Sequence, residues 1–545
     1  ATACSGSDGD DASPGSDTTE SDAATGGGGA DAERPPCERP PEPAPEAAAV
    51  PGTSRDLDVT SFDGTRIRAH WFPLEGADDD EPAPAILMGP GWGQAGDTNE
   101  GTTGLLGAAS IGALRDNGYH VLTWDPRGFG ESDGTAEVNS PDTEARDVGV
   151  LLDWVAAQPG VQLDGEGDPR SGMIGGSYGG GIQTVTAAID CRVDALVPVM
   201  AWHSLETSLY KAETPKAGWA NILNQVAASR PVDPHVEAAA TSMNATGTVS
   251  AEDIEWFVER GPGDLVEDIT APTLFVQGTV DTLFTLDEAI TNYRALRDNG
   301  VPTAMVWYCG GHGTCLTSAD DTERVDTAAM AWLDRYVKDD PEVDTGPRFD
   351  FVDESGARYT ADDYPLDAGT AVTASGSGTL DLVAEGGAGP VTDPPEALGA
   401  DPLRGLVLPV TPAEATNAVE VAIPAPDAPV LVVGAPELTL TYRGEVEDGD
   451  RPTRVFAQLV DSATGLTVGN QVTPIEVTLD GDEHTAEVEL EVIAQSLTPD
   501  TQLTLQLVAT TVAYAEPRLG GSVTFESVDV SLPTAADLTP APGSL

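Results

Sequence analysis

The sequence predicts an α/β domain built on a mostly parallel sheet, followed by a separate all-β domain. Between about residues 55 and 340, short apolar runs alternate with segments of helical periodicity, which is typical of a parallel sheet covered by helices. After about residue 340, many short segments of alternating apolar and polar residues lie between turn signals, which is typical of a β-sandwich or jelly roll. At 545 residues the chain is long enough for both domains.

Residues 1–50 are expected to be a disordered tether. They are rich in Gly, Ser, Asp, Pro and Ala, a composition that cannot bury enough apolar surface to fold. The opening Ala1-Thr2-Ala3-Cys4 looks like the end of a bacterial lipoprotein signal, where a small-residue box precedes a lipidated cysteine. We therefore expect lipidation at Cys4 and an extracellular or cell-surface location. The alternative is that Cys4 is an unmodified thiol in a disordered tail.

The first domain, residues 55–340, is expected to begin with a hairpin. Residues 57–72 form two alternating segments around the Asp63-Gly64 turn. Continuous apolar runs then predict buried strands at residues 85–88, 121–124, 172–174, 273–276 and 304–308. Helical patterns lie near residues 103–117, 142–157, 179–189 and 287–299. Strands that alternate with helices in this way predict a doubly wound parallel sheet.

Three later segments complete the predicted organisation. Residues 204–266 are a long helical insertion, which we expect to cover the carboxyl end of the sheet as a cap, where ligands of α/β proteins bind. Residues 341–425 are rich in Pro and Gly and are expected to be a connection with a few strands. Residues 426–535 are expected to form the β-sandwich or jelly-roll domain.

Ser177 is the candidate nucleophile. Gly175-Gly176-Ser177-Tyr178-Gly179-Gly180 follows an apolar strand and precedes a helical run. Glycines flank such a serine because the tight strand-to-helix turn forces neighbouring side chains together and holds the serine in a strained conformation. This context predicts a nucleophile elbow, the turn that presents the serine of an α/β-hydrolase fold.

A serine nucleophile needs a general base, and the base needs an orienting carboxylate. Asp281 ends the strand that begins at residue 273, and His312 follows the strand at residues 304–308. The order Ser177, Asp281, His312 is the one expected for an α/β-hydrolase. The other histidines considered, His70, His120, His235 and His484, lie on early strands, in the cap or in the second domain. Asp287 and Asp268 are the alternatives to Asp281.

Several residues are expected to contact the reacting substrate. The backbone N–H of Tyr178 and that of Trp92, in Gly89-Pro90-Gly91-Trp92-Gly93, are the candidate oxyanion donors. Trp202 and Trp219 are candidate substrate-binding residues. Arg127, in the loop at residues 125–132, is expected to shape the site, although it could also reach a substrate.

The five cysteines are too few for a disulfide scaffold. Cys309 and Cys315 bracket His312, and the glycines between them allow a disulfide that would hold the histidine loop outside the cytoplasm. Two free thiols or a metal site are the alternatives, but one His between two Cys is short of the ligands that zinc needs. Cys37 and Cys191 could form a second disulfide.

Charge and the remaining motifs exclude several functions. Acidic residues outnumber basic ones 91 to 26, for a net charge of −65, which disfavours nucleic acids and anionic membrane surfaces as partners. No apolar run is long enough to span a bilayer, so membrane contact is expected only through the lipid at Cys4. No phosphate-binding loop, zinc helix motif or dinucleotide fingerprint occurs, so neither a cofactor nor a metal is implied.

With these motifs the chain resembles the peptidase S15 and CocE/NonD hydrolases, the cocaine-esterase-like and Xaa-Pro dipeptidyl-peptidase superfamily. The resemblance covers nearly everything after residue 55 and is carried by residues 175–180, residues 124–134, Asp281, His312 and the C-terminal jelly roll. It implies cleavage of Xaa-Pro peptides, aryl esters or β-lactam precursor esters by acyl transfer to serine. Cocaine-esterase relatives use a tyrosine as one oxyanion donor, whereas this loop carries Trp92.

The sequence therefore predicts an exported serine hydrolase of small ester or amide substrates. We rank carboxylic ester hydrolysis above Xaa-Pro dipeptide release because no residue is evident that would hold a free substrate amine. Glu206 and Glu213 in the cap are candidates for that role. The alternative of another class is a catalytically inert lipoprotein whose jelly roll binds a carbohydrate or polymer at the cell surface.

Overall fold

The structure is a computed structural model of the 545-residue chain. It describes residues 55–101, 110–317, 322–392, 408–446, 453–515, 519–536, 538 and 540–541, which all belong to one compact unit. The expected tether at residues 1–50, with Cys4 and Cys37, lies outside the described residues. So does most of the first half of the helix expected at residues 103–117.

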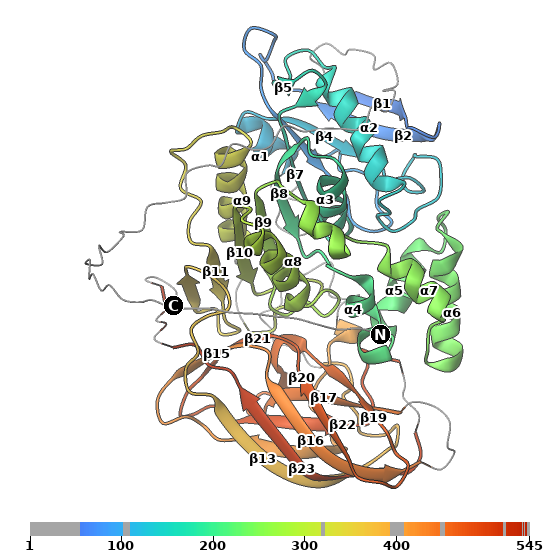
Figure 1. The fold of residues 1–545 in the computed structure, drawn as a ribbon, viewed down its shortest axis with the longest axis vertical. Helices are drawn as coiled ribbons and strands as arrows, with labels where there is room; N and C mark the ends of the chain where they lie inside the picture. The colour runs from blue at the N-terminus through green and yellow to red at the C-terminus, as the bar shows by residue number, and fades with distance from the viewer. Residues whose placement is uncertain are drawn as a thin grey trace, which may run out of the picture. The chain divides into compact units, whose positions relative to one another are not determined.

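A ten-stranded sheet forms the centre of the first domain (Figure 1). Its order is β1-β2-β4-β3-β7-β8-β9-β10-β11-β12, and the strands from β4 to β11 in this order run parallel. The outer strands β1, β2 and β12 are antiparallel to their neighbours. The bounds are β1 Arg55–Thr60, β2 Arg66–Phe72, β3 Ala85–Met88, β4 His120–Trp124, β7 Ser171–Gly176, β8 Val193–Val199, β9 Thr273–Gly278, β10 Thr303–Tyr308, β11 Phe349–Val352 and β12 Arg358–Ala361. A separate two-stranded ribbon joins β5 (Leu163–Gly165) and β6 (Asp168–Pro169).

Helices cover both faces of this sheet. One apolar cluster joins one sheet face to α2 (Glu144–Ala156), α3 (Tyr178–Ile189) and α8 (Leu286–Asp298). A second cluster joins the opposite face to α1 (Ile111–Asp116) and α9 (Thr322–Tyr336). The central strands are buried on both faces, which explains why they appear in the sequence as continuous apolar runs. The predicted α/β-hydrolase fold is confirmed.

The segment between β8 and β9 forms a helical cap. It holds α4 (Leu205–Leu209), α5 (Ala217–Ala227), α6 (Pro234–Thr246) and α7 (Ala251–Val258), with 3₁₀ turns at Lys211–Glu213 and Gly263–Asp268. Local signals set the ends of these helices. Asp233 caps α6 ahead of Pro234, and Gly247 ends the helix in a left-handed conformation. Ser250 caps α7 by accepting a hydrogen bond from the N–H of Asp253.

The second domain is a β-sandwich (Figure 1). One sheet has the order β13-β23-β16-β20, and the other has β14-β22-β17-β18 with β19 also paired to β17. Their inward-facing side chains form one apolar core. The strands are β13 Val372–Asp381, β14 Ala418–Ile423, β15 Val430–Gly434, β16 Glu437–Glu445, β17 Thr453–Asp461, β18 Leu466–Thr467, β19 Thr473–Val477, β20 His484–Glu489, β21 Ile493–Leu497, β22 Leu503–Val508 and β23 Ser522–Leu532. A further pair joins β15 and β21.

The segment at residues 341–425 contributes to both domains. Its strands β11 and β12 extend the first sheet beyond residue 340, and its strands β13 and β14 lie in the sandwich. The sequence of β13, Val-Thr-Ala-Ser-Gly-Ser-Gly-Thr-Leu-Asp, contains few large apolar side chains. Its alternation is therefore weak, although every second residue faces the core side. Among the described residues, no helix combines the length and apolar character that crossing a bilayer requires.

Polar contacts join the cap to the sandwich. Lys211 Nζ lies 2.7 Å from Glu491 Oε1, which is buried. The Arg454 guanidinium donates to the backbone carbonyl of Ala212 at 3.0 Å and to Thr214 Oγ1 at 2.9 Å. These contacts hold the first cap segment, between α4 and α5, against the second domain.

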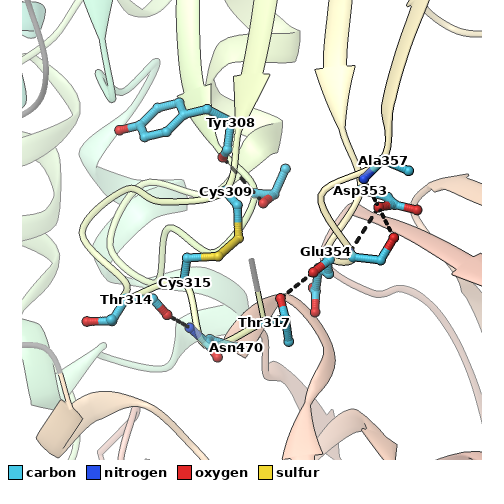
Figure 2. Close-up of a disulfide and its surroundings, with 11 residues drawn as sticks. Tyr308, Cys309, Thr314, Cys315, Thr317, Asp353, Glu354, Ala357 and Asn470 are labelled. Atoms are coloured by element: carbon cyan, nitrogen blue, oxygen red, sulfur yellow. Dashed lines mark hydrogen bonds between the residues drawn. A yellow bond between two sulfur atoms is a disulfide. The ribbon is translucent and has the colours of Figure 1, made fainter. Parts of the chain in front are cut away.

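Glu354 is a buried carboxyl group in the turn after β11. Its side chain is 7% exposed, and among the described residues Oε1 has no hydrogen-bond partner. Its backbone carbonyl accepts a hydrogen bond from Thr317 Oγ1 (Figure 2). Burial raises the pKa of Glu354 to about 8, and the negative charges of Asp353 and Asp461 add to this shift. Glu354 therefore carries a proton near neutral pH.

We expect Glu354→Gln to remove a pH-dependent loss of stability. The folded protein keeps the Glu354 proton up to about pH 8, whereas the unfolded chain releases it near the ordinary pKa of 4.5. The stability of the native protein therefore falls as the pH rises between these values. Glutamine stays neutral, so the Tm of the variant minus that of the native protein should grow from about pH 5 to about pH 8 in scanning calorimetry.

Glu437→Gln is the matched control, because Glu437 is exposed at the start of β16. Its Tm difference should stay flat over the same pH range. An equally flat profile for Glu354→Gln would contradict the proposed protonation state.

Candidate active site

Ser177 stands at a strained turn between β7 and α3. Its φ is 55° and its ψ is −118°, a conformation that non-glycine residues rarely adopt. Its N–H donates to Val199 O on β8 at 2.8 Å, which anchors the turn to the sheet. A Cβ at Gly179 would lie 2.0 Å from the carbonyl oxygen of Gly89, so only glycine fits there. The sequence motif is thus a nucleophile elbow in three dimensions.

Ser177, His312 and Asp281 form one hydrogen-bonded chain. His312 Nε2 lies 2.8 Å from Ser177 Oγ, and His312 Nδ1 lies 2.8 Å from Asp281 Oδ2. Asp281 is fully buried, and its Oδ1 accepts hydrogen bonds from the N–H groups of Leu283 and Phe284 at 2.9 Å each. The carboxylate is therefore fixed in orientation before it meets the imidazole.

The two alternatives to Asp281 lie elsewhere. Asp268 is an exposed residue at the end of the second 3₁₀ turn of the cap. Asp287, on α8, lies 3.8 Å from Lys211 Nζ, and burial raises its pKa to about 7, with the charge of Glu491 acting in the same direction. Neither carboxylate has a hydrogen bond to His312 in the structure.

The other histidines considered also have separate partners. His70 contacts Asp56 and Asp125, and His235 contacts Asp253. His120 pairs with backbone groups, and His484 lies beside Asp480 in the sandwich. Only His312 reaches Ser177 among the described histidines.

The candidate oxyanion donors flank Ser177. Tyr178 is the first residue of α3, so its N–H has no acceptor within that helix. Trp92 lies in the loop after β3, and its indole ring packs edge-on against Tyr178 at 5.1 Å between ring centroids. Trp92 Nε1 donates to the carbonyl of Leu223 in the cap at 3.0 Å. The Trp92 side chain is therefore engaged with the cap, which leaves its backbone N–H as the candidate donor.

A disulfide closes the loop that carries His312 (Figure 2). Cys309 and Cys315 are joined with a Cα–Cα distance of 5.4 Å, six residues apart in the chain. Such a short closed loop restricts where His312 can move. Cys37, the expected partner of Cys191, lies outside the described residues.

The sandwich domain braces the loops that carry His312 and Asp281. Gln471 Nε2 donates to the backbone carbonyl of Asp281 at 2.8 Å. The preceding residue, Asn470, donates from Nδ2 to the carbonyl of Thr314 at 3.1 Å (Figure 2). Both side chains are at least nine-tenths buried. The second domain therefore contributes directly to the position of the candidate triad.

Lys216 supports the same region from the cap. Its buried Nζ donates to the carbonyl of Leu283 at 2.9 Å, two residues after Asp281 in the chain. Burial lowers the pKa of Lys216. Neither Lys216 nor the Asn470-Gln471 pair was expected from the sequence. The small number of lysines in the chain was the only available signal for Lys216, and Asn470 and Gln471 carry no recognisable motif.

A cavity opens beside Ser177 and runs into the cap. Its space, including the open mouth, amounts to about 960 Å³. Among the residues that line it are Ser177, Trp92, Tyr178 and Trp202. Trp202 thus lies where a substrate contact was expected, with its Nε1 tied to Arg260 O. Trp219 is not among the lining residues and instead packs edge-on against His312 at 5.7 Å between ring centroids.

Three charged residues considered from the sequence occupy different surroundings. Glu206 lies at the edge of the cavity and is exposed. Glu213 Oε2 is 3.3 Å from the Arg454 guanidinium of the sandwich domain and does not line the cavity. Arg127 is buried and binds Asp147 and Asp63, so it shapes the fold around the site rather than facing a substrate.

Comparison with known proteins places the first domain in a group of hydrolases. Residues 63–314 match the X-Pro dipeptidyl-peptidase (S15) family. An uncharacterised 31.7 kDa protein from Escherichia coli is 28% identical over 171 residues, which are 31% of this chain and 57% of that protein. A polyketide transferase from a Penicillium species is 28% identical over 146 residues, 26% of this chain and 44% of that protein. The chain thus spans about half the length of these curated relatives.

Solved structures match over nearly the whole chain. A CocE/NonD family hydrolase from Staphylococcus aureus has a TM-score of 0.63 at 13% identity, covering 88% of this chain and 93% of that one. An aminopeptidase from a marine sediment archaeon of the Thaumarchaeota has a TM-score of 0.67 at 14% identity, covering 91% and 98%. An α-amino acid ester hydrolase has a TM-score of 0.66 at 12% identity, covering 88% and 96%. At these identities the matches show the shared fold, including the C-terminal sandwich.

We expect Gln471→Ala to lower kcat about tenfold with little change in KM, because the loop holding Asp281 loses its buried hydrogen bond and the imidazole is less well oriented. Steady-state kinetics with a p-nitrophenyl ester measure both constants. Gln502→Ala, an exposed glutamine elsewhere in the sandwich, is the control and should leave kcat unchanged. Equal kcat values for the two variants would show that the sandwich does not position the candidate triad.

Proposed function

Residues 63–314 of this chain form a domain of the X-Pro dipeptidyl-peptidase (S15) family, and we propose that it is a serine hydrolase that cleaves carboxylic esters by acyl transfer to Ser177. The observation that carries this proposal is the hydrogen-bonded chain from Ser177 through His312 to the buried carboxylate of Asp281. Its geometry is that of a nucleophile, a general base and an orienting group. The elbow conformation of Ser177 supports the same assignment.

The proposed reaction has two stages. Ser177 Oγ attacks the ester carbonyl while His312 Nε2 takes its proton, and the N–H groups of Tyr178 and Trp92 stabilise the oxyanion. Collapse of this intermediate expels the alcohol, which receives the proton from His312. Water, activated by His312, then attacks the acyl-enzyme and releases the acid. Asp281 holds the imidazole in the required tautomer and stabilises the imidazolium that forms.

Release of Xaa-Pro dipeptides, the activity in the family's name, is the second candidate function. A dipeptidyl-peptidase must hold the protonated amine of its substrate, which requires a carboxylate close to the reacting serine. Glu213 is paired with Arg454, and Glu206 is exposed at the cavity edge. Glu206 is the one carboxylate among the lining residues of the cavity. Ester hydrolysis is therefore favoured over release of Xaa-Pro dipeptides. The hydrogen-bonded geometry of the complete triad disfavours an inert binding lipoprotein.

Hydrolysis assays separate these three functions. We expect the native protein to hydrolyse a p-nitrophenyl ester faster than Ala-Pro p-nitroanilide, and Ser177→Ala to reduce ester turnover by about 10⁴-fold or more. A melting curve of the variant controls for misfolding. Faster turnover of the anilide would identify a dipeptidyl-peptidase. Failure of the native protein to cleave either substrate would favour the binding lipoprotein.

We also propose that the protein acts outside the cytoplasm and is anchored by a lipid on Cys4. The disulfide between Cys309 and Cys315 supports an oxidising location. The small-residue box before Cys4 supports lipidation. The strongly negative charge of the chain would keep the rest of the protein away from an anionic lipid surface.

When the gene product is expressed in a bacterial host fed with an alkyne-tagged palmitate, we expect the label to appear on the protein and to be lost in Cys4→Ala. Cys37→Ala is the matched control and should keep the label. In-gel fluorescence after click coupling measures both. A label that persists in Cys4→Ala, or an unlabelled native protein, would rule out the anchor.

A further inference from the structure

The cavity beside Ser177 is walled almost entirely by apolar side chains. Val236, Ala239, Ala240 and Met243 of α6 line it. Their spacing of three and four residues places them on one face of that helix. Further walls come from α4, α5, α7 and the segment after Asp281, through side chains such as Leu223, Phe257 and Leu283.

Two small side chains give the cavity its depth. Ala239 and Ala240 are buried at the centre of the lining face of α6, where larger residues would fill the space. Glu206 is the one charged residue among the lining residues, and it is exposed. An apolar chain would leave water on entering this space, whereas a charged or strongly polar group would lose its hydration with few partners.

The position of His312 shows which half of an ester would enter the cavity. In acyl transfer the leaving alcohol must lie next to the imidazole that protonates it. His312 and Trp219, which packs against it, do not line the cavity, whereas Phe284, which packs edge-on against His312 at 5.1 Å between ring centroids, does. Trp92 and Tyr178, the candidate oxyanion donors, do line the cavity. The imidazole thus stands beside the cavity and not in its wall, so we place the acyl side of the reacting bond toward the cavity and the leaving group toward the imidazole.

From these observations we propose that the cavity is an acyl-chain site and that the substrates are esters of medium-chain aliphatic acids. This inference rests on the proposed ester hydrolase function and gives it a substrate class. The alcohol part then lies beside His312 and outside the cavity, so its structure should have little influence on the rate.

The direct test compares two series of substrates on the native protein. In the first, p-nitrophenyl esters carry acyl chains from acetyl to dodecanoyl. We expect kcat/KM to rise by up to about fourfold for each added methylene group that is buried, and to level off when the cavity is full. In the second series, acetate esters of alcohols of increasing length should show no comparable rise. A rise confined to the alcohol series would overturn the acyl assignment.

Substitutions on α6 test whether the dependence of kcat/KM on acyl-chain length arises in this cavity. Ala240→Phe places a ring in the cavity and should lower the ratio of octanoate to acetate kcat/KM at least tenfold, because the chain is excluded. Ala238→Phe is the matched control, since Ala238 is exposed and does not line the cavity. Its ratio should equal that of the native protein. Met243→Ala enlarges the cavity, so kcat/KM should level off at a longer acyl chain than in the native protein.

The outcomes separate this inference from the proposed function. If no ester is cleaved, or if Ser177→Ala keeps full activity, the hydrolase assignment itself fails. If esters are cleaved but the acyl series is flat, only the acyl-chain site fails. If Ala240→Phe loses all activity, the acyl series is measured on Met243→Ala instead. If kcat/KM then levels off at the same chain length as in the native protein, the proposal is also overturned.

Discussion

The backbone conformation of Ser177 is the constraint on which the site depends. A positive φ at a non-glycine residue is unfavourable and persists only where the surroundings fix it. Here the surroundings are the hydrogen bond from Ser177 to β8 and the close approach of Gly179 to the carbonyl of Gly89. That approach brings the loop after β3 against the elbow. It therefore places Trp92 beside the serine at the same time as it exposes the hydroxyl.

The second domain completes the site rather than merely following it. Asp281 and His312 lie in loops that follow two neighbouring strands, β9 and β10, so the sheet fixes where both loops begin. Their outer parts are held by Gln471 and Asn470 of the sandwich. The disulfide closes the histidine loop from within. Three separate devices thus fix groups whose distances must be right to within a fraction of an ångström for proton transfer.

The sequence was sufficient where a local pattern carries the information. The elbow, the order of Ser177, Asp281 and His312, and the cysteines around His312 are each readable from a few residues, and the structure brings those residues together. The apolar runs predicted the parallel strands because those strands are buried on both faces.

The sequence was insufficient where the arrangement depends on distant segments. The contact of Gln471 with Asp281 joins residues that are 190 positions apart and follows no motif. Trp219, a candidate substrate contact, packs against His312, and no sequence motif indicated that contact. Helix α9 has an amphipathic sequence pattern, but no helix was predicted there from the sequence. The cavity results from how four cap helices assemble, which no local pattern encodes.

Covalent labelling tests the central claim most directly. The protein is incubated with a p-nitrophenyl alkylphosphonate, which transfers its phosphonyl group to an activated serine, and the labelled peptide is then identified by mass spectrometry. Our account predicts one label per chain on Ser177, and none on Ser177→Ala. An unlabelled native protein, or a label on another serine, would contradict the assignment of Ser177 as the nucleophile.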